Sequence, residues 1–286
     1  MKKKVILLLE AILVIVIAFS IYKIASYYKS ERDFKASQDE YLDEAKETRD
    51  ELEAILNDKD NDNDDNDDGV ETISVVDKLK ESYNAVDEES GAEKDGSLAG
   101  VKAGKTPKEL INALAKKYKH IIGRIIVDGT EIDFPIVQGT DNTFYLNHGY
   151  KDEYNLLGAV FMDARNANDF MDFNSVIYGH NVRSGHIFHD LDKLKDEDFV
   201  KAHPYIIVDT LEERHVYEVV AVYTAGAYED YRSPSYSDEA YEALLERIKE
   251  KNLLQKQMPE GEFKMLTLST CSDVDDRLAI HAIEIK

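Results

Sequence analysis

The chain contains a single thiol, Cys271, which stands six positions before Arg277. Cys271 ends one apolar, strand-like run and Arg277 begins another, with a short polar connection between them. If the two runs form an antiparallel hairpin, their side chains lie nearly opposite one another on one face. A guanidinium in that place can lower the pKa of a thiol or stabilise an oxyanion. The pair suggests nucleophilic chemistry; the plainer alternatives are a buried apolar cysteine and a surface arginine that balances neighbouring aspartates.

A cysteine nucleophile also needs a proton carrier, which is normally histidine. Of the eight histidines, His180 stands out because an apolar run ends in a glycine directly before it, where a side chain can emerge at a strand edge. His281 falls on the same strand face as Arg277 by alternation. His186 and His189 have the spacing of some zinc pairs, but no third ligand is evident. We therefore expect neither a metal nor a cofactor.

Short strands are predicted to position these residues. They lack the alternation with helices that a parallel sheet requires, so a mainly antiparallel barrel or sandwich is expected. One helix is predicted from the capping box at Thr106 to about His120, and another from Ser237 to about Lys251. The predicted strands are Ile121–Val127, Ile132–Val137, Ala159–Asp163, Ser175–Tyr178, Tyr205–Val208, His215–Tyr223, Lys264–Ser269 and Leu278–Ile285.

The charge of the chain is concentrated outside this region. The 286 residues carry a formal net charge of −23, which argues against nucleic-acid binding because phosphate backbones require clustered Lys and Arg. Residues 29–105 hold 25 Asp and Glu against 11 Lys and Arg. The acidic excess therefore describes a segment that precedes the predicted strands.

The N-terminus reads as a membrane anchor. Three lysines in residues 1–4 precede an apolar run within residues 5–24, which is near the length that spans a bilayer as a helix. The basic residues predict a cytoplasmic N-terminus and an extracellular remainder. A cleaved signal peptide is the alternative, although the apolar run is long for one and lacks a good cleavage site.

Residues 25–105 are expected to form an acidic extracellular stalk or linker. Residues 28–56 read as a polar helix with a weak seven-residue repeat, either a solvated stalk or a coiled coil. Asp64–Gly69 resembles half of a calcium-binding loop, but Val75 stands where a bidentate Glu is needed. A self-repelling linker is the simpler interpretation, with weak cation binding as the alternative.

Several motifs within residues 106–286 together resemble the class B sortases. Thr267–Cys271 followed by Arg277 and Leu278–Ala282 is similar to the active-site strand pair of that family. Ser175–Asn181 is similar to its catalytic-histidine segment, and two further stretches agree: Asp141–Asn147 and Gly158–Asp163. The connection between Cys271 and Arg277 is shorter than in many class B members, which puts its share in substrate contacts in doubt.

The resemblance implies an eight-stranded β-barrel with an N-terminal helix and a helix between strands six and seven. It makes Cys271 the nucleophile, His180 the general acid and base, and Arg277 the residue that holds the oxyanion or positions the substrate. It also implies a substrate groove lined by Asn142, Leu146, Tyr178, Ser269 and Thr270.

The activity so implied is that of a membrane-anchored transpeptidase. Such an enzyme cleaves a C-terminal sorting signal after Thr, forms a Cys thioester and passes the protein to an amine of a peptidoglycan precursor or a pilin. The expected partners are surface proteins with sorting signals, the amine acceptor and the membrane. The alternatives are another extracellular cysteine hydrolase and a non-catalytic, membrane-tethered binding protein.

Overall fold

A closed β-barrel forms the body of the protein in the computed structural model. The model describes residues 2–57, 74–83, 106–226, 228–256, 258–261, 263–271 and 276–285, with the backbone alone for Lys2 and Cys271. The acidic run of Asp64–Gly69 and most of the predicted linker lie outside the described residues. The described strands are β1 (Ile121–Val127), β2 (Asp133–Gln138), β3 (Val160–Met162), β4 (Asn174–Val182), β5 (His186–Ile187), β6 (Tyr205–Thr210), β7 (Arg214–Gly226), β8 (Met265–Cys271) and β9 (Asp276–Glu284).

Eight of these described strands close on themselves. Their order is β3-β2-β1-β6-β7-β9-β8-β4, and pairing of β3 with β4 completes the ring, while β5 extends β4 as a short hairpin. The β2–β3 and β4–β8 pairs are parallel and the other barrel pairs are antiparallel. Inward-facing Ile125, Val208, Leu268 and Ile280 are fully buried in the interior. The predicted eight-stranded barrel is confirmed.

Helices cover the outside of the barrel. They are α1 (Lys2–Asn57), α2 (Val75–Ser82), α3 (Pro107–Lys117), α4 (Glu197–Ala202) and α5 (Asp238–Lys251), with 3-10 turns η3 (Phe144–Leu146) and η4 (His189–Lys195). The capping box that opens α3 has both of its hydrogen bonds, between Thr106 and Glu109. Ser237 caps α5, which lies between the sixth and seventh barrel strands, β7 and β8, as expected.

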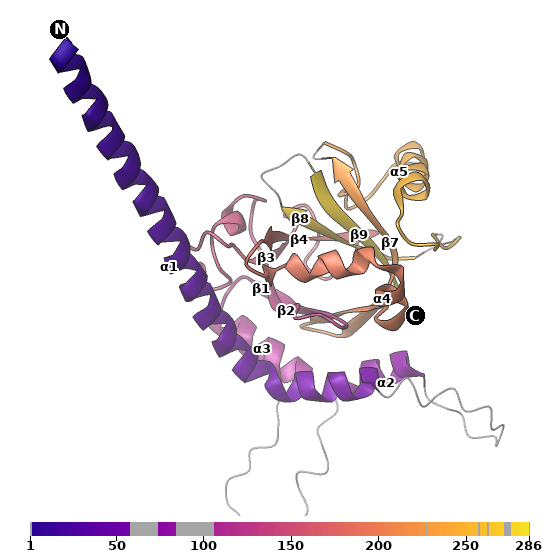
Figure 1. The fold of residues 1–286 in the computed structure, drawn as a ribbon. Coiled ribbons are helices and arrows are strands. Elements are labelled where there is room, and N and C mark those ends of the chain that lie inside the picture. Colours follow the sequence, from indigo (N-terminus) through magenta and orange to yellow (C-terminus); the bar gives the residue numbers. More distant parts are fainter. Residues whose placement is uncertain are drawn as a thin grey trace, which may run out of the picture.

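The predicted anchor and the predicted stalk helix form one helix, α1. Its most apolar window has a mean hydropathy of 2.8 and is wholly exposed, so by length and composition it can cross a membrane. Figure 1 shows the N-terminal half of α1 projecting away from the barrel and its C-terminal half running along the barrel beside α2 and α3.

The C-terminal half of α1 has one buried face, so the expectation of a solvated stalk needs correction. Tyr41, Ala45, Thr48 and Leu52 are each 2% exposed or less. These residues belong to the weak seven-residue repeat seen in the sequence. The repeat marks the apolar stripe of α1 that packs on α2, α3 and the barrel strands.

A buried ion pair locks this face of α1 to β1 and β2. Arg124 is fully buried and donates from Nε and Nη2 to the carboxylate of Asp133, at 2.8 and 2.6 Å. It also donates to Thr48 Oγ1 at 2.8 Å, and Tyr41 donates to Asp133 at 2.6 Å. The two α1 residues complete a polar cluster that the barrel strands alone would leave unsatisfied.

We predict that α1 contributes directly to the stability of the barrel. Leu52→Ala should lower the free energy of unfolding by roughly 2–5 kcal/mol, because it opens a cavity between α1, α2 and the sheet. The matched control Glu47→Ala, on an exposed face of the same helix, should change it by less than about 0.5 kcal/mol. Urea unfolding of the detergent-solubilised chain measures both, and equal midpoints would contradict the packing of α1.

Candidate active site

Parallel pairing of β4 with β8 brings His180 and Cys271 together. The register runs from Asn174 beside Met265 to His180 beside Cys271, at the last described residue of β8. Residues paired across two parallel strands lie side by side, so His180, two residues before the end of β4, stands next to Cys271. Two segments about 90 residues apart in sequence thus meet at a common edge.

Gly179 allows β4 to reach this edge beneath the β4–β5 hairpin. A Cβ at position 179 would lie 2.7 Å from the ring of Phe188, closer than a real side chain tolerates. The amide of Phe188 donates to the carbonyl of His180 at 3.0 Å, which ties the hairpin to the strand. The glycine before His180 is therefore required by close packing, not by an unusual backbone angle.

The β8–β9 hairpin places Arg277 beside the end of β8. The antiparallel register ends at Ser269 opposite Ala279, and two further steps along each strand lead to Cys271 and Arg277. Arg277 donates from Nη1 to the carbonyl of Thr270 at 3.4 Å, directly before the cysteine. Its Nε is buried and has no hydrogen-bond partner among the described residues. The residues that connect the two strands, 272–275, lie outside the described part.

His180 is held by a backbone carbonyl. Its Nε2 lies 2.8 Å from the carbonyl oxygen of Leu146 in η3, and its side chain is half-buried. A carbonyl oxygen only accepts, so Nε2 carries the proton in this contact and Nδ1 is the nitrogen that gains or loses one. The contact fixes the ring at the rim of the cavity described next.

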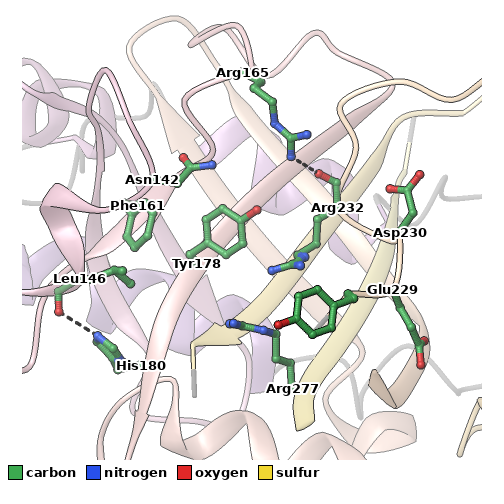
Figure 2. Close-up of a pocket in the computed structure, with 11 residues that line it drawn as sticks. Asn142, Leu146, Phe161, Arg165, Tyr178, His180, Glu229, Asp230, Arg232 and Arg277 are labelled. Atoms are coloured by element: carbon green, nitrogen blue, oxygen red, sulfur yellow. Dashed lines mark hydrogen bonds between the residues drawn. The ribbon is translucent and has the colours of Figure 1, made fainter. Parts of the chain in front are cut away.

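A cavity of about 510 Å³ opens beside these residues. Figure 2 shows Tyr178 at its centre, His180 and Leu146 on one side, and the guanidinium groups of Arg232 and Arg277 directed into it. Three of the groove residues expected from the sequence, Asn142, Leu146 and Tyr178, line this cavity together with His180 and Arg277. The sequence did not point to the other lining residues, which are Phe161, Arg165, Tyr228, Glu229, Asp230 and Arg232.

The two remaining expected groove residues lie elsewhere. Ser269 is fully buried, and its hydroxyl pairs with that of Tyr231 at 2.9 Å. Thr270 accepts a hydrogen bond from the amide of Leu278 and lines a second cavity of about 450 Å³, which shares Arg277 with the first. Arg277 therefore stands between two cavities.

Buried Asp163 organises the wall of the first cavity. Arg165 donates to both of its oxygens at 2.9 and 2.8 Å, and Tyr178 donates to it at 2.7 Å. Burial opposes ionisation, but the hydrogen bonds from Arg165 and Tyr178 outweigh it and lower the pKa of Asp163 to about 2. Burial and the charge of Asp163 raise the pKa of Tyr178, so its hydroxyl stays protonated as a donor. Arg165 also donates to the carbonyl of Arg232 at 2.7 Å, which joins the β7–α5 loop to this wall (Figure 2).

Comparison with known proteins identifies one family. A family model described as a sortase domain matches residues 125–284. Sortase B of Listeria monocytogenes is 37% identical over 167 residues, which cover 57% of this chain and 67% of that protein. Sortase B of Staphylococcus aureus is 29% identical over 163 residues, which cover 56% of this chain and 67% of that protein.

Solved structures agree. A Staphylococcus aureus sortase B–substrate complex matches with a TM-score of 0.58 and 28% identity, covering 63% of this chain and 86% of that one. Sortase B of Bacillus anthracis in complex with AAEK1 matches with a TM-score of 0.56 and 37% identity, covering 62% and 85%.

The lowered pKa of Asp163 predicts a pH-dependent stability. An unfolded aspartate has a pKa of about 3.9, so the folded state gains stability above that pH and loses it as the pH falls toward 2. The free energy of unfolding of the wild type should therefore exceed that of Asp163→Asn by about 2 kcal/mol near neutral pH. This difference should shrink between about pH 4 and pH 2. Urea unfolding across this range measures it, with exposed Glu242→Gln as the control. A difference that does not vary with pH would contradict the charged state of Asp163.

Proposed function

We propose that this chain, which belongs to the sortase family and is a sortase B-type cysteine transpeptidase, carries out its reaction with Cys271, His180 and Arg277. The observation that supports the assignment most strongly is the β4–β8 pairing, which sets His180 beside Cys271. Arg277 adds a cation that reaches the carbonyl of the residue preceding Cys271. Among the described residues, His180 and Arg277 both line the cavity centred on Tyr178.

Acylation begins with a thiolate on Cys271 and a proton on His180. The sulfur attacks the carbonyl carbon of a Thr in the sorting signal, and the carbonyl oxygen takes the negative charge. Arg277 stabilises that oxyanion with its guanidinium, which is directed into the cavity, because a fixed donor in a partly dry site interacts more strongly with developing charge than water does. The carbon–nitrogen bond then breaks, His180 gives its proton to the leaving amine, and a thioester remains.

Transfer reverses the proton movement. An acceptor amine attacks the thioester carbon, and neutral His180 takes the proton that the amine loses. The new amide forms as the carbon–sulfur bond breaks and the thiolate of Cys271 leaves. The bond from His180 Nε2 to the Leu146 carbonyl keeps the ring in one orientation through both steps, with Nδ1 as the exchanging nitrogen.

The sorting signal is proposed to occupy the cavity lined by Asn142, Leu146 and Tyr178. A Staphylococcus aureus relative with the same fold forms a complex with a substrate, which supports substrate binding by this fold. The cavity wall offers the Tyr178 hydroxyl and the Asn142 amide as polar contacts and Phe161 as an apolar one. Ser269 and Thr270 are proposed to support the cysteine strand rather than to line this cavity.

The chain is proposed to be a single-pass membrane protein with its N-terminus in the cytoplasm and its catalytic domain outside. The exposed apolar half of α1 supports the anchor, and the lysines of residues 1–4 support the orientation. This location brings the enzyme to secreted proteins that carry sorting signals and to an amine of a peptidoglycan precursor or a pilin.

Covalent trapping is the direct test of the nucleophile. Incubation with a sorting-signal peptide should give a mass increase on Cys271 that an added amine removes, and Cys271→Ala should show neither the adduct nor turnover. Release by water at the same rate with and without amine would indicate a hydrolase instead. Turnover that persists in Cys271→Ala would refute the assignment.

Arg277→Lys should reduce kcat/KM by about 100-fold or more, because an ammonium does not reproduce the fork of donors that a guanidinium presents. Arg49→Lys, on α1 and far from the cavity, is the matched control and should keep the wild-type value. Steady-state peptide cleavage measures both variants. A near-normal value for Arg277→Lys would remove Arg277 from the mechanism.

A further inference from the structure

The barrel meets α1 only a few residues after the apolar run ends. A helix rises 1.5 Å per residue, so Tyr27 and Ser30 stand about 5 and 9 Å beyond Ile24 along the axis. The polar layer on each side of a bilayer is about 5–8 Å thick. If α1 spans the membrane up to Ile24, the first contacts with the barrel lie at the depth of the lipid headgroups.

Two loops of the catalytic domain contact α1 at this level. Ser30 accepts a hydrogen bond from Asn155 Nδ2 at 2.9 Å through its carbonyl, and from the amide of Leu156 at 3.3 Å through its hydroxyl. The hydroxyl of Tyr27 lies 3.4 Å from that of Ser184, at the tip of the β4–β5 hairpin. These contacts leave no free spacer between α1 and the domain at this point.

The β4–β5 hairpin is also held one turn further along α1. His186 Nε2 lies 3.5 Å from a carboxylate oxygen of Glu31, and the His186 ring packs on Phe34 with centroids 5.4 Å apart. Phe34 in turn contacts Phe134 of β2. The orientation of the hairpin relative to α1 is therefore fixed by contacts at its tip and on β5.

The side chains exposed at this level suit a lipid surface. Tyr28 and Tyr154 are 65% and 61% exposed, and Tyr154 directly precedes the residue that binds Ser30. Arg183 is exposed at the tip of the hairpin. Tyrosine is favoured at membrane interfaces because its ring is apolar and its hydroxyl is polar, and arginine is favoured beside anionic headgroups.

Local charge agrees with such a surface although the whole chain is acidic. Residues 23–35 of α1 contain four Lys or Arg and two Asp or Glu. Each basic group near an anionic leaflet contributes about 1 kcal/mol of attraction, and the effect fades within a Debye length. The acidic excess of residues 36–105 begins further along the helix, beyond the headgroup layer.

We propose that the catalytic domain rests on the lipid headgroups of the bilayer that holds α1, through Tyr28, Tyr154 and the Arg183 tip of the β4–β5 hairpin. This inference depends on the membrane anchor of the proposed function. His180 stands three residues before Arg183, so the proposed active site lies close to the membrane surface.

The absence of tryptophan from the chain allows a direct test. Three single-tryptophan variants of the full-length chain, Tyr154→Trp, Leu211→Trp and Val14→Trp, are placed in vesicles of phosphatidylglycerol and phosphatidylcholine. A nitroxide quencher is carried either on the lipid headgroup or deep in the acyl chain. Leu211 is the control because it follows Thr210, whose carbonyl binds Tyr83 near the far end of α1. Unchanged peptide cleavage in each variant shows that it is folded.

Tyr154→Trp should lose about half of its fluorescence to the headgroup quencher, and Leu211→Trp should lose none. Val14→Trp should be quenched by the deep nitroxide, which reports insertion of α1. If Val14→Trp is quenched but Tyr154→Trp behaves as Leu211→Trp does, the domain stands clear of the lipid and the inference is wrong. If Val14→Trp is not quenched by the deep nitroxide, the anchor fails and the inference fails with it, whereas the assignment of Cys271 is unaffected.

Discussion

The parallel pairing of β4 with β8 is the constraint on which the site depends. Most neighbours in this barrel are antiparallel, and antiparallel strands bring the start of one segment beside the end of the other. The β4–β8 pair is parallel instead, as β2–β3 is, and its register sets His180 beside Cys271 at one edge. The β8–β9 hairpin then needs only a short connection to add Arg277 at the same edge.

Burial of one face of α1 joins this helix to the catalytic domain. The Arg124–Asp133 pair would be costly inside the sheet on its own, since buried ions require every hydrogen bond that they can make. Thr48 and Tyr41 supply two of those bonds from α1. A helix that serves as the proposed anchor at one end thus forms part of the folded domain at the other, and the two cannot move independently.

Much of this could be predicted from the sequence, and the remainder has identifiable causes. The strands and both capped helices follow from alternation and local capping, and the proximity of Cys271 to Arg277 follows from hairpin geometry. The environment of α1 did not follow, because a weak seven-residue repeat is the same whether a helix or a sheet covers it. The β7–α5 loop, which brings Arg232 into the cavity, has no periodicity from which its position could be inferred. The resemblance implied Ser269 in the groove, yet alternation along β8 places it on the outer face of the barrel, where its bond to Tyr231 keeps it buried under the β7–α5 loop.

The contact between His180 and Leu146 has a consequence for how such an enzyme can diverge. The side chain of Leu146 lines the cavity, whereas its carbonyl holds the imidazole. A point mutation can replace the side chain but not the carbonyl, because every residue type carries the same main-chain acceptor. Selection can therefore alter ligand preference at this position while the proton carrier keeps its support, so that specificity and catalysis evolve separately within one residue.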